Sequence, residues 1–410
     1  MSELSYLEKL LDGVKVEWLP LGEITKYEQP TKYLVKAKDY HDTYTIPVLT
    51  AGKTFILGYT NETHGIYQAS KAPVIIFDDF TTANKWVDFD FKAKSSAMKM
   101  VTSCDDNKTL LKYVYYWLNT LPSEFAEGDH KRQWISNYSQ KKIPIPCPDN
   151  PEKSLAIQSE IVRILDKFTA LTAELTAELT AELTMRKKQY NYYRDQLLSF
   201  DEEQEKPIYL EKLLDGVEVE WKLLGDASFF EIANNGRKPV KSSLRIAGKT
   251  PYYGANNIQD YVDGYTHDGE YVLIAEDGSA SLENYSIQYA TGKFWANNHV
   301  HVVRGKTRVN SRFLFHYLHI VNFIPFLTGG VRAKLTKGQL IEISVPIPCP
   351  DNTEKSLAIQ AEIVRILDKF DTLTNSITEG LPREIELRQK QYEYYRDLLF
   401  SFPKPETVSN

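Results

Sequence analysis

The stretch PIPCPDNPEKSLAIQSEIVRILDKF, at Pro144–Phe168, occurs twice in this chain and decides how it must fold. Its second copy, PIPCPDNTEKSLAIQAEIVRILDKF at Pro346–Phe370, is identical at 23 of 25 positions. Two further segments recur at nearly the same offset: Tyr6–Gly22 with Tyr209–Gly225 (14 of 17 positions) and Gln189–Phe200 with Gln391–Phe402 (9 of 12). A period of 202–203 residues indicates a duplicated half-protein rather than a solenoid.

The inserts between the repeats, roughly residues 24–142 and 227–344, share a skeleton but little identity. Each has a Pro-led segment, a buried strand that ends in acids (VIIFDD or VLIAED), another strand and an apolar helix. A Gly-basic loop, GDHKR or GGVRAK, then leads back into the repeat. We expect inserts of similar fold and different surface chemistry. We call the repeated segments, residues 6–22, 144–168 and 189–200 with their second copies, the frame. Two copies of one frame predict that the chain binds the same kind of partner twice, about a pseudo-two-fold axis, whereas each insert binds a different ligand.

Long helices follow the repeated PIPCPDN segments. From Pro151 to about Phe200 the chain has no Gly or further Pro, and its apolar residues alternate at the four- and three-residue spacing of a coiled-coil seam. Thr172–Leu183 is three copies of TAEL, and we predict that one leucine stripe there is core: Leu171, Leu175, Leu179 and Leu183. Gly380 and Pro382 interrupt the second copy and predict a break. Antiparallel packing of the two helices would hold the inserts a fixed distance apart.

Composition excludes several classes of protein. The 410 residues suffice for two or three domains, and 42% hydrophobic with 25% charged residues is typical of a soluble globular chain. Three scattered cysteines favour neither a disulfide framework nor a zinc site, and the chain has no membrane-length apolar run or signal-peptide pattern. We therefore expect a cytoplasmic protein. Its net charge of −6 does not reflect the local charge of residues 304–340, which hold seven basic residues and no acidic one.

Two copies of AGKT resemble the end of a phosphate-binding loop, at Ala51–Thr54 and Ala247–Thr250. The glycine that such a loop needs five residues earlier is replaced by Pro47 and Ser243. The sequence also lacks G-x-G-x-x-G, H-E-x-x-H, G-x-S-x-G and the Asn/Asp-Pro-Pro-Tyr/Phe tetrapeptide of amino-methyltransferases. We interpret the chain as non-catalytic by itself.

Other polar clusters have plainer interpretations. The acidic pairs Asp78-Asp79 and Glu276-Asp277 are more typical of strand or turn caps than of acid–base catalysis. His299 and His301 alternate on a predicted strand, where packing or a polar contact is favoured over half of a metal site.

Taken together, PIPCPDN, EKSLAIQ, the TAEL units and Q-Y-x-Y-Y-R-D resemble the specificity subunit of a Type I restriction–modification system, in particular the type IC subfamily with TAEL units in its spacer. The resemblance covers essentially the whole chain. PYYGAN, VLIAEDGS and GKFWANNHVHVV in the second insert are similar to the core of the family's target-recognition domains. The first insert departs from that pattern, with FDDFTT and FKAKSSAMKMV at the corresponding places.

The resemblance implies an α+β fold. Two target-recognition domains would be related by pseudo-two-fold symmetry and separated by two long antiparallel coiled-coil helices. The expected divisions are a first recognition domain, a spacer helix with TAEL repeats, a second recognition domain, a second long helix and a tail, at residues 1–150, 151–200, 201–350, 351–403 and 404–410.

The function implied is DNA specificity without catalysis. Each recognition domain would read one half of a bipartite, asymmetric DNA target in the major groove, while the helices set the gap and dock methyltransferase subunits. The expected partners are double-stranded DNA, two methyltransferase (modification) subunits and two restriction/translocase subunits. AdoMet, ATP and Mg²⁺ would be bound by these partners and none by this chain. The assembled complex would be an adenine-specific methyltransferase and an ATP-dependent endonuclease.

Candidate DNA contacts follow from residue chemistry, because Arg and Lys pair with guanine while Asn and Gln pair with adenine. In the first domain we predict Lys26, Lys32, Lys53, Lys131 and Arg132. In the second we predict Arg237, Lys238, Asn256, Asn257, Arg332, Lys334 and Lys337. An alternative is a scaffold that spaces two client-binding domains without touching DNA. An autonomous nuclease or methyltransferase is disfavoured by the missing motifs.

Overall fold

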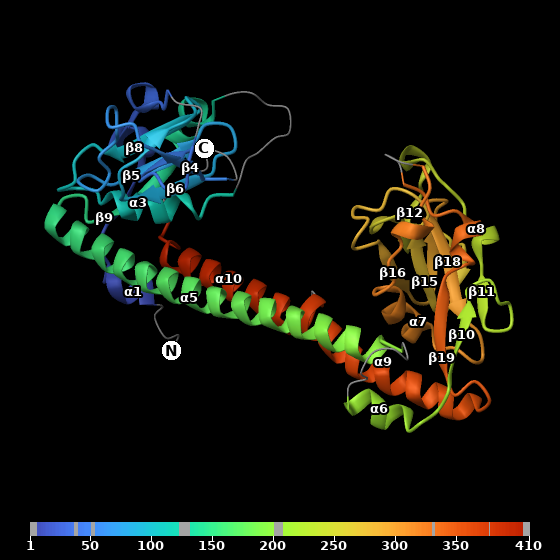
Figure 1. Ribbon diagram of the computed structural model, residues 1–410. Helices are drawn as coiled ribbons and strands as arrows, with labels where there is room; N and C mark the ends of the chain where they lie inside the picture. The colour runs from blue at the N-terminus through green and yellow to red at the C-terminus, as the bar shows by residue number, and fades with distance from the viewer. Residues whose placement is uncertain are drawn as a thin grey trace. The chain divides into compact units, whose positions relative to one another are not determined.

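The computed structural model describes residues 6–36, 40–50, 54–122, 132–200, 208–329, 333–376 and 378–404. The chain divides into two compact units. Unit 1 comprises Met1–Glu178 with Ile385–Asn410, and unit 2 comprises Leu179–Glu384. Each unit therefore holds one insert together with parts of the long helices (Figure 1).

The repeated sequence forms a short helix and an antiparallel strand pair in each unit. In unit 1 these are α1 (Tyr6–Leu11), β1 (Val16–Pro20) and β9 (Lys142–Pro146). In unit 2 they are α6 (Ile208–Leu214), β10 (Val219–Leu223) and β19 (Ser344–Pro348). The register is the same in both, since Trp18 faces Pro144 and Trp221 faces Pro346. Each pair joins the two ends of one insert.

The insert of unit 1 folds into two sheets. The central antiparallel sheet has the order β2 (Thr25–Glu28), β8 (Met98–Ser103), β5 (Val74–Asp78), β6 (Asn84–Val87). The second sheet has the order β4 (Ile56–Thr60), β3 (Ile46–Leu49), β7 (Lys92–Ala93). Strand β5 is buried along its whole length because Ile75 and Phe77 face the core that contains the helices, whereas Val74 and Ile76 belong to a separate apolar cluster on the other face. Burial on both faces explains its continuous apolar sequence.

Unit 2 repeats this arrangement. Its central sheet has the order β11 (Phe230–Ile232), β18 (Val300–Gly305), β15 (Tyr271–Ala275), β16 (Ile287–Ala290). Its second sheet has the order β13 (Ile258–Val262), β12 (Ala247–Tyr253), β17 (Lys293–Ala296), β14 (His267–Asp268). The predicted skeleton of Pro-led segment, buried strand, second strand and helix is thus confirmed in both inserts.

Short helices complete the two units. Unit 1 contains α2 (Leu21–Ile24), η1 (Pro30–Tyr33), α3 (Leu111–Leu118), α4 (Gln133–Ser136) and η2 (Tyr138–Gln140). Unit 2 contains η3 (Asn234–Gly236), η4 (Ser242–Leu244), α7 (Ser311–Leu318), η5 (Ile324–Phe326) and α8 (Lys337–Leu340).

Strand register establishes which residues correspond between the units. Ile75 faces Val101 in the central sheet of unit 1, and Val272 faces Val303 in that of unit 2. Counting from these pairs, Lys99 corresponds to His301, and Asp79 corresponds to Glu276. At the sheet edge, the facing pair Lys26 and Thr102 corresponds to the facing pair Glu231 and Arg304.

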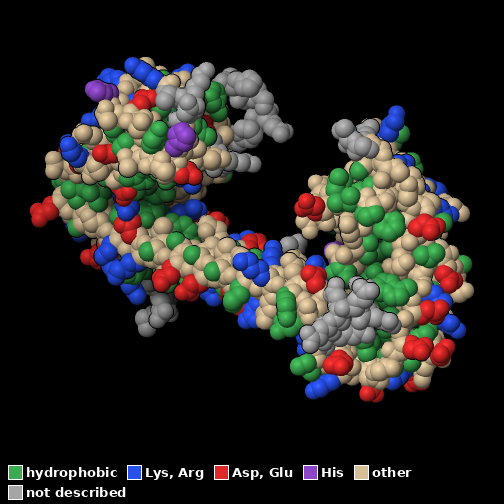
Figure 2. Space-filling model, viewed as in Figure 1, with side chains coloured by type: hydrophobic (Ala, Val, Ile, Leu, Met, Phe, Trp, Pro, Cys, Tyr) green, Lys and Arg blue, Asp and Glu red, His purple; other side chains and the backbone are tan. Residues whose placement is uncertain are grey.

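The first long helix, α5 (Pro151–Leu198), has 48 residues, a length of about 72 Å at 1.5 Å per residue. The second copy is two helices, α9 (Thr353–Asn375) and α10 (Gly380–Leu399), which confirms the predicted break. Gly380 has φ +78°, and a Cβ there would lie 2.6 Å from the Thr372 carbonyl oxygen, so the turn requires glycine. Figure 2 shows acidic and basic side chains along the exposed surface of these helices.

Each unit is completed by a helix end from the other half of the sequence. The core of unit 1 contains Leu399, Phe400 and Phe402, packed with residues near the start of α5. The core of unit 2 contains Leu197, Leu198 and Phe200, from the end of α5 and beyond. In unit 1 α5 and α10 are antiparallel neighbours.

Two contacts in unit 1 establish that direction. Phe168 stacks on Tyr395 with ring centroids 5.5 Å apart, and the Thr169 hydroxyl donates to the Tyr392 hydroxyl at 3.2 Å. The fold is α+β, with two recognition-type domains and long helices.

The TAEL leucines differ from the prediction. Leu171 is 50% exposed, and Leu175, Leu179 and Leu183 are only half-buried, so the predicted core stripe is wrong for Leu171 and incomplete for the others. A four-residue repeat rotates by about 400°, so its leucines drift by about 40° per unit away from any one face. The contact between two helices buries only a narrow stripe of each helix, and the drift moves some of the leucines out of that stripe.

Candidate functional site

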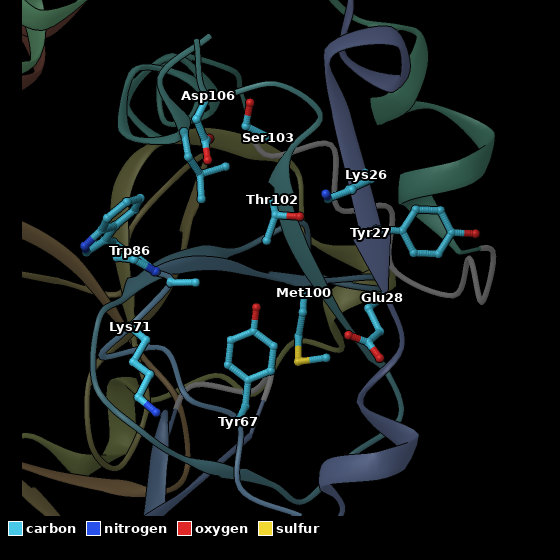
Figure 3. Close-up of a pocket in the computed structure, with 13 residues that line it drawn as sticks. Lys26, Tyr27, Glu28, Tyr67, Lys71, Trp86, Met100, Thr102, Ser103 and Asp106 are labelled. Atoms are coloured by element: carbon cyan, nitrogen blue, oxygen red, sulfur yellow. The ribbon is translucent and has the colours of Figure 1, made fainter. Parts of the chain in front are cut away.

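A pocket of about 660 Å³ lies against the central sheet in unit 1, with a lining that includes residues of the edge strand β2, of β8 and of β6 (Figure 3). Lys26 and Lys71 are exposed at its rim, and Tyr67 and Trp86 supply aromatic walls. In Figure 3 the Tyr27 ring points away from the other labelled side chains. Exposed cationic groups at this place suit the phosphates of a nucleic acid.

The corresponding edge of unit 2 has different chemistry. Glu231 and Arg304 replace Lys26 and Thr102, and they form an ion pair of 2.6 Å. The Arg304 guanidinium also lies over the Tyr271 ring, 4.8 Å from its centroid. One position of the shared skeleton therefore presents an exposed lysine, Lys26, in unit 1 and an ion pair in unit 2.

A buried acid, Asp79, anchors the segment around α4 that leads back into β9 in unit 1, which we call the return segment. Asp79 follows β5 directly, and its Oδ1 accepts a hydrogen bond from the Trp134 backbone N–H at 3.0 Å. Its Oδ2 lies 3.2 Å from the Lys99 Nζ, and both side chains are fully buried. The Asp79 carbonyl accepts a further bond from the Gln133 N–H at 2.8 Å. This carboxylate thus holds α4 and, with it, the position of Arg132.

Glu276 has the same place in unit 2. Its carboxylate pairs with Arg237 at 2.6 Å and with Lys334 at 3.0 Å. The Leu335 N–H donates to the Glu276 carbonyl at 2.8 Å, as Gln133 does to Asp79. Burial by itself raises the pKa of Glu276, but the hydrogen bonds from Arg237 and Lys334 outweigh it and lower the pKa below its usual value.

His301 takes the place of Lys99 and is neutral. Its Nε2 lies 2.7 Å from the Leu335 carbonyl oxygen, to which it must donate, and its Nδ1 accepts from the Asn234 amide at 2.9 Å. Burial lowers the pKa of His301. In both units the acid after the central strand therefore fixes the return segment, a contact of the kind expected of a strand or turn cap.

The predicted DNA contacts of unit 1 divide into three groups. Lys26 is exposed at the pocket rim, and Arg132 is exposed where α4 begins. Lys32 is exposed but pairs with Glu28 at 3.0 Å. Lys53 and Lys131 lie outside the described residues.

In unit 2 two of the predicted DNA contacts, Arg237 and Asn256, form hydrogen bonds within the unit. Arg237 donates to Glu276 and to the Val300 carbonyl (2.8 Å), and Asn256 bridges Gly278 and Ala280 through both ends of its amide. This geometry favours a supporting role for these two residues. Lys334 is exposed and paired with Glu276; Arg332 lies outside the described residues. The remaining candidates are exposed: Lys238, Asn257 and Lys337.

Sequence reasoning missed Lys99 and the partners of Glu276. Lys99 sits inside AMKMV, where a single lysine in an apolar strand was the available signal of a buried ion pair. His299, next to His301, is exposed and contacts Asp277 at 2.5 Å. Among the described residues, no three His, Cys, Asp or Glu side chains form a group that could hold a metal ion. No helix in the described parts of the chain has the length and hydropathy of a membrane span.

Comparison with known proteins identifies the family of this chain. The family model for the Type I restriction modification DNA specificity domain matches residues 14–185 and 218–387. The chain is 63% identical, over the full length of both, to the specificity subunit of the EcoR124I/EcoR124II Type I restriction enzyme of Escherichia coli.

It is 37% identical to the EcoprrI specificity subunit of E. coli, over 92% of this chain and 93% of that one. The fold is similar to that of the S subunit from M. genitalium, with a TM-score of 0.51 at 16% identity over 98% of this chain and 99% of that one. With its repeated frame and two recognition domains, the chain belongs to the family of Type I restriction–modification DNA specificity subunits.

Proposed function

We propose that this subunit recognises a bipartite, asymmetric DNA target, one part through each unit. The observation that carries the proposal is the contrast between two equivalent anchors. The acids Asp79 and Glu276 hold equivalent return segments, but the residues around them differ in charge and size. Equal scaffolds with unlike contact chemistry are what two unlike half-targets require.

DNA contacts in the major groove would come from exposed cations and amides. Phosphate contacts fix position, whereas base contacts carry sequence information. The exposed candidates that support this are Lys26, Arg132, Lys238, Asn257 and Lys337. Lys53, Lys131 and Arg332 complete the proposed set, with Lys32 and Lys334 released from their acidic partners or bound beside them.

The duplicated frame supports docking of two copies of one methyltransferase subunit. Tyr6 donates to Glu160 at 2.8 Å, and Tyr209 donates to Glu362 at 2.7 Å. All four groups lie on the surface, so each half presents the same feature to a partner. We further propose two restriction/translocase subunits, with AdoMet, ATP and Mg²⁺ bound by the partners. The complex would methylate adenine and cut DNA with ATP.

The test is a methylome. The chain is expressed with its methyltransferase partner in an unmodified host, and modified adenines are mapped by long-read sequencing. A split motif with a fixed gap of roughly 6–8 base pairs, about 20–27 Å of duplex, is expected. Exchange of the insert at residues 24–142 should change one half-motif and leave the other. Assembly without any modified motif would refute DNA specificity and leave a protein scaffold.

The TAEL repeats should set the gap. Deleting one unit, Thr172–Leu175, removes about 6 Å of α5, against about 3.4 Å per base pair. We expect the gap in the methylated motif to shorten by one or two base pairs with both half-motifs unchanged. The control inserts one further TAEL unit and should lengthen the gap. A gap indifferent to both changes would refute a ruler function for α5.

A further inference from the structure

Unit 2 carries an exposed basic turn whose tip is apolar. The turn, residues 238–249, has the sequence KPVKSSLRIAGK, with four basic residues and no acidic one. It includes η4 and the start of β12. Leu244 is 70% exposed and Ile246 is 72% exposed, the highest values of any leucine or isoleucine in the described residues apart from Ile208. Two large apolar side chains thus face solvent on a turn that carries four basic residues.

The turn is braced rather than loose. The Arg245 guanidinium stacks over the Tyr252 ring at 4.2 Å from its centroid and donates to the Val240 carbonyl at 3.2 Å. The Tyr252 hydroxyl accepts from the Val240 N–H at 3.0 Å, and the Trp295 indole donates to the Lys238 carbonyl at 2.7 Å. These contacts hold the tip in place before any partner arrives.

The return of the turn into β12 is equally constrained. The Asp263 N–H donates to the Ile246 carbonyl at 2.8 Å. A Cβ on Gly248 would lie 2.3 Å from the Val262 carbonyl oxygen, so only glycine allows the strands to approach this closely. The second AGKT segment, Ala247–Thr250, is therefore part of a bulged strand pair rather than a phosphate-binding loop.

Charge identifies the partner as DNA. Lys238, Lys241 and Lys249 are exposed, and no ion pair involves them within the described parts of the chain. Lysine is depleted at the centres of protein–protein interfaces but neutralises DNA phosphates. Leu and Ile wedges flanked by cations are typical of proteins that enter the minor groove and unstack a base step. In unit 1 the corresponding stretch before β3, residues 35–45, holds two lysines balanced by two aspartates, whereas the turn of unit 2 has no acidic residue.

We propose that the basic turn inserts Leu244 and Ile246 into the minor groove beside the half-target read by unit 2, with Lys238, Lys241 and Lys249 on the flanking phosphates. The inference rests on the DNA-recognition function of the family. It adds a contact that distorts the duplex without reading its bases, since a wedge between base pairs senses how easily a step unstacks.

The test uses the chain assembled with its methyltransferase partner and a duplex that carries 2-aminopurine at successive steps flanking this half-target. The native complex should raise 2-aminopurine fluorescence at one step. The variant Leu244→Ser/Ile246→Ser should abolish the rise and weaken binding roughly tenfold, with the salt dependence of binding unchanged. The variant Leu244→Met/Ile246→Val should restore both. Replacing the three lysines by alanine should lower the salt slope by about 2–3.

The matched control is Ile56→Ser/Leu57→Ser, an exposed apolar pair on β4 of unit 1, which should leave the fluorescence signal unchanged. Unchanged fluorescence and affinity in Leu244→Ser/Ile246→Ser would overturn the wedge, while a persisting methylated motif keeps the proposed function. Loss of methyltransferase assembly in that variant would identify a protein contact instead and also overturn it. If the native complex methylated no motif in DNA, that result would instead count against the proposed function.

Discussion

Units 1 and 2 solve the same structural problem with different chemistry. In unit 1 the acid after the central strand, Asp79, meets one cation, Lys99, in a fully buried pair. In unit 2 Glu276 meets two cations near the surface, and the interior position is occupied by neutral His301. The comparison teaches that the backbone contact to the return segment is what the fold retains, because both carbonyls accept it at 2.8 Å. The ionic partners of the acid differ between the two units.

The largest difference in stability between the units should follow substitution of the interior residue, Lys99 in unit 1 and His301 in unit 2. In Lys99→Met the Asp79 carboxylate stays buried without a counter-charge, and unit 1 should lose about 3–5 kcal/mol of unfolding free energy. His301→Gln should cost unit 2 only about 1–2 kcal/mol, because Glu276 keeps Arg237 and Lys334. Pulse proteolysis in urea, with fragments assigned to each unit, measures both values. The control Lys99→Met/Asp79→Asn should recover most of the loss. Equal losses in the two units would refute the contrast.

The second-largest difference should lie in how the stability of each unit responds to low pH. His319 caps α7, and its Nδ1–H donates to the Phe315 carbonyl at 2.9 Å; the corresponding Asn119 caps α3 and donates to the Tyr115 carbonyl at 2.8 Å. Burial lowers the pKa of His319 to about 4, only partly offset by that hydrogen bond. Because the folded pKa lies below the unfolded value of about 6.5, the stabilisation is complete above pH 6.5 and is lost as pH falls toward 4.

Unit 2 should therefore lose about 1–3 kcal/mol between pH 6.5 and 4 through this group, and unit 1 should lose nothing by the same route. Urea midpoints of each unit across this range measure the slope. His319→Asn should flatten the slope of unit 2, and Asn119→His should create one in unit 1. A slope in unit 2 that persists unchanged in His319→Asn would assign its acid sensitivity to other groups.

The smallest expected effect is a difference of zero. Tyr6→Phe and Tyr209→Phe each remove one surface hydrogen bond to a glutamate, worth about 0.5 kcal/mol. The two frames share their sequence and geometry, so the losses should agree within experimental error when each unit's unfolding is followed by hydrogen exchange. Unequal losses would show that the inserts alter the frame that carries them.

Much of the architecture could be predicted because it is written in local patterns. The internal repeat, the apolar strands and the long helix from Pro151 are visible in sequence, as is the break at Gly380. The anchors could not be predicted, because pairing of Lys99 with Asp79 depends on strand register rather than on spacing along the chain. The pairing of Arg237 with Glu276 could not be predicted for the same reason, because the two residues lie 39 positions apart.

The cores of the two units give the polypeptide an unusual topology. Phe402 packs in the same core as Leu7, and the Trp18 indole donates to the Pro403 carbonyl at 2.9 Å. In unit 2, Phe200 and Leu210 share a core in the same way, with the chain running on from one to the other. The same junction is thus made once between segments far apart in the sequence and once between consecutive segments. The packing of each unit is therefore indifferent to the order in which the two inserts follow one another along the polypeptide.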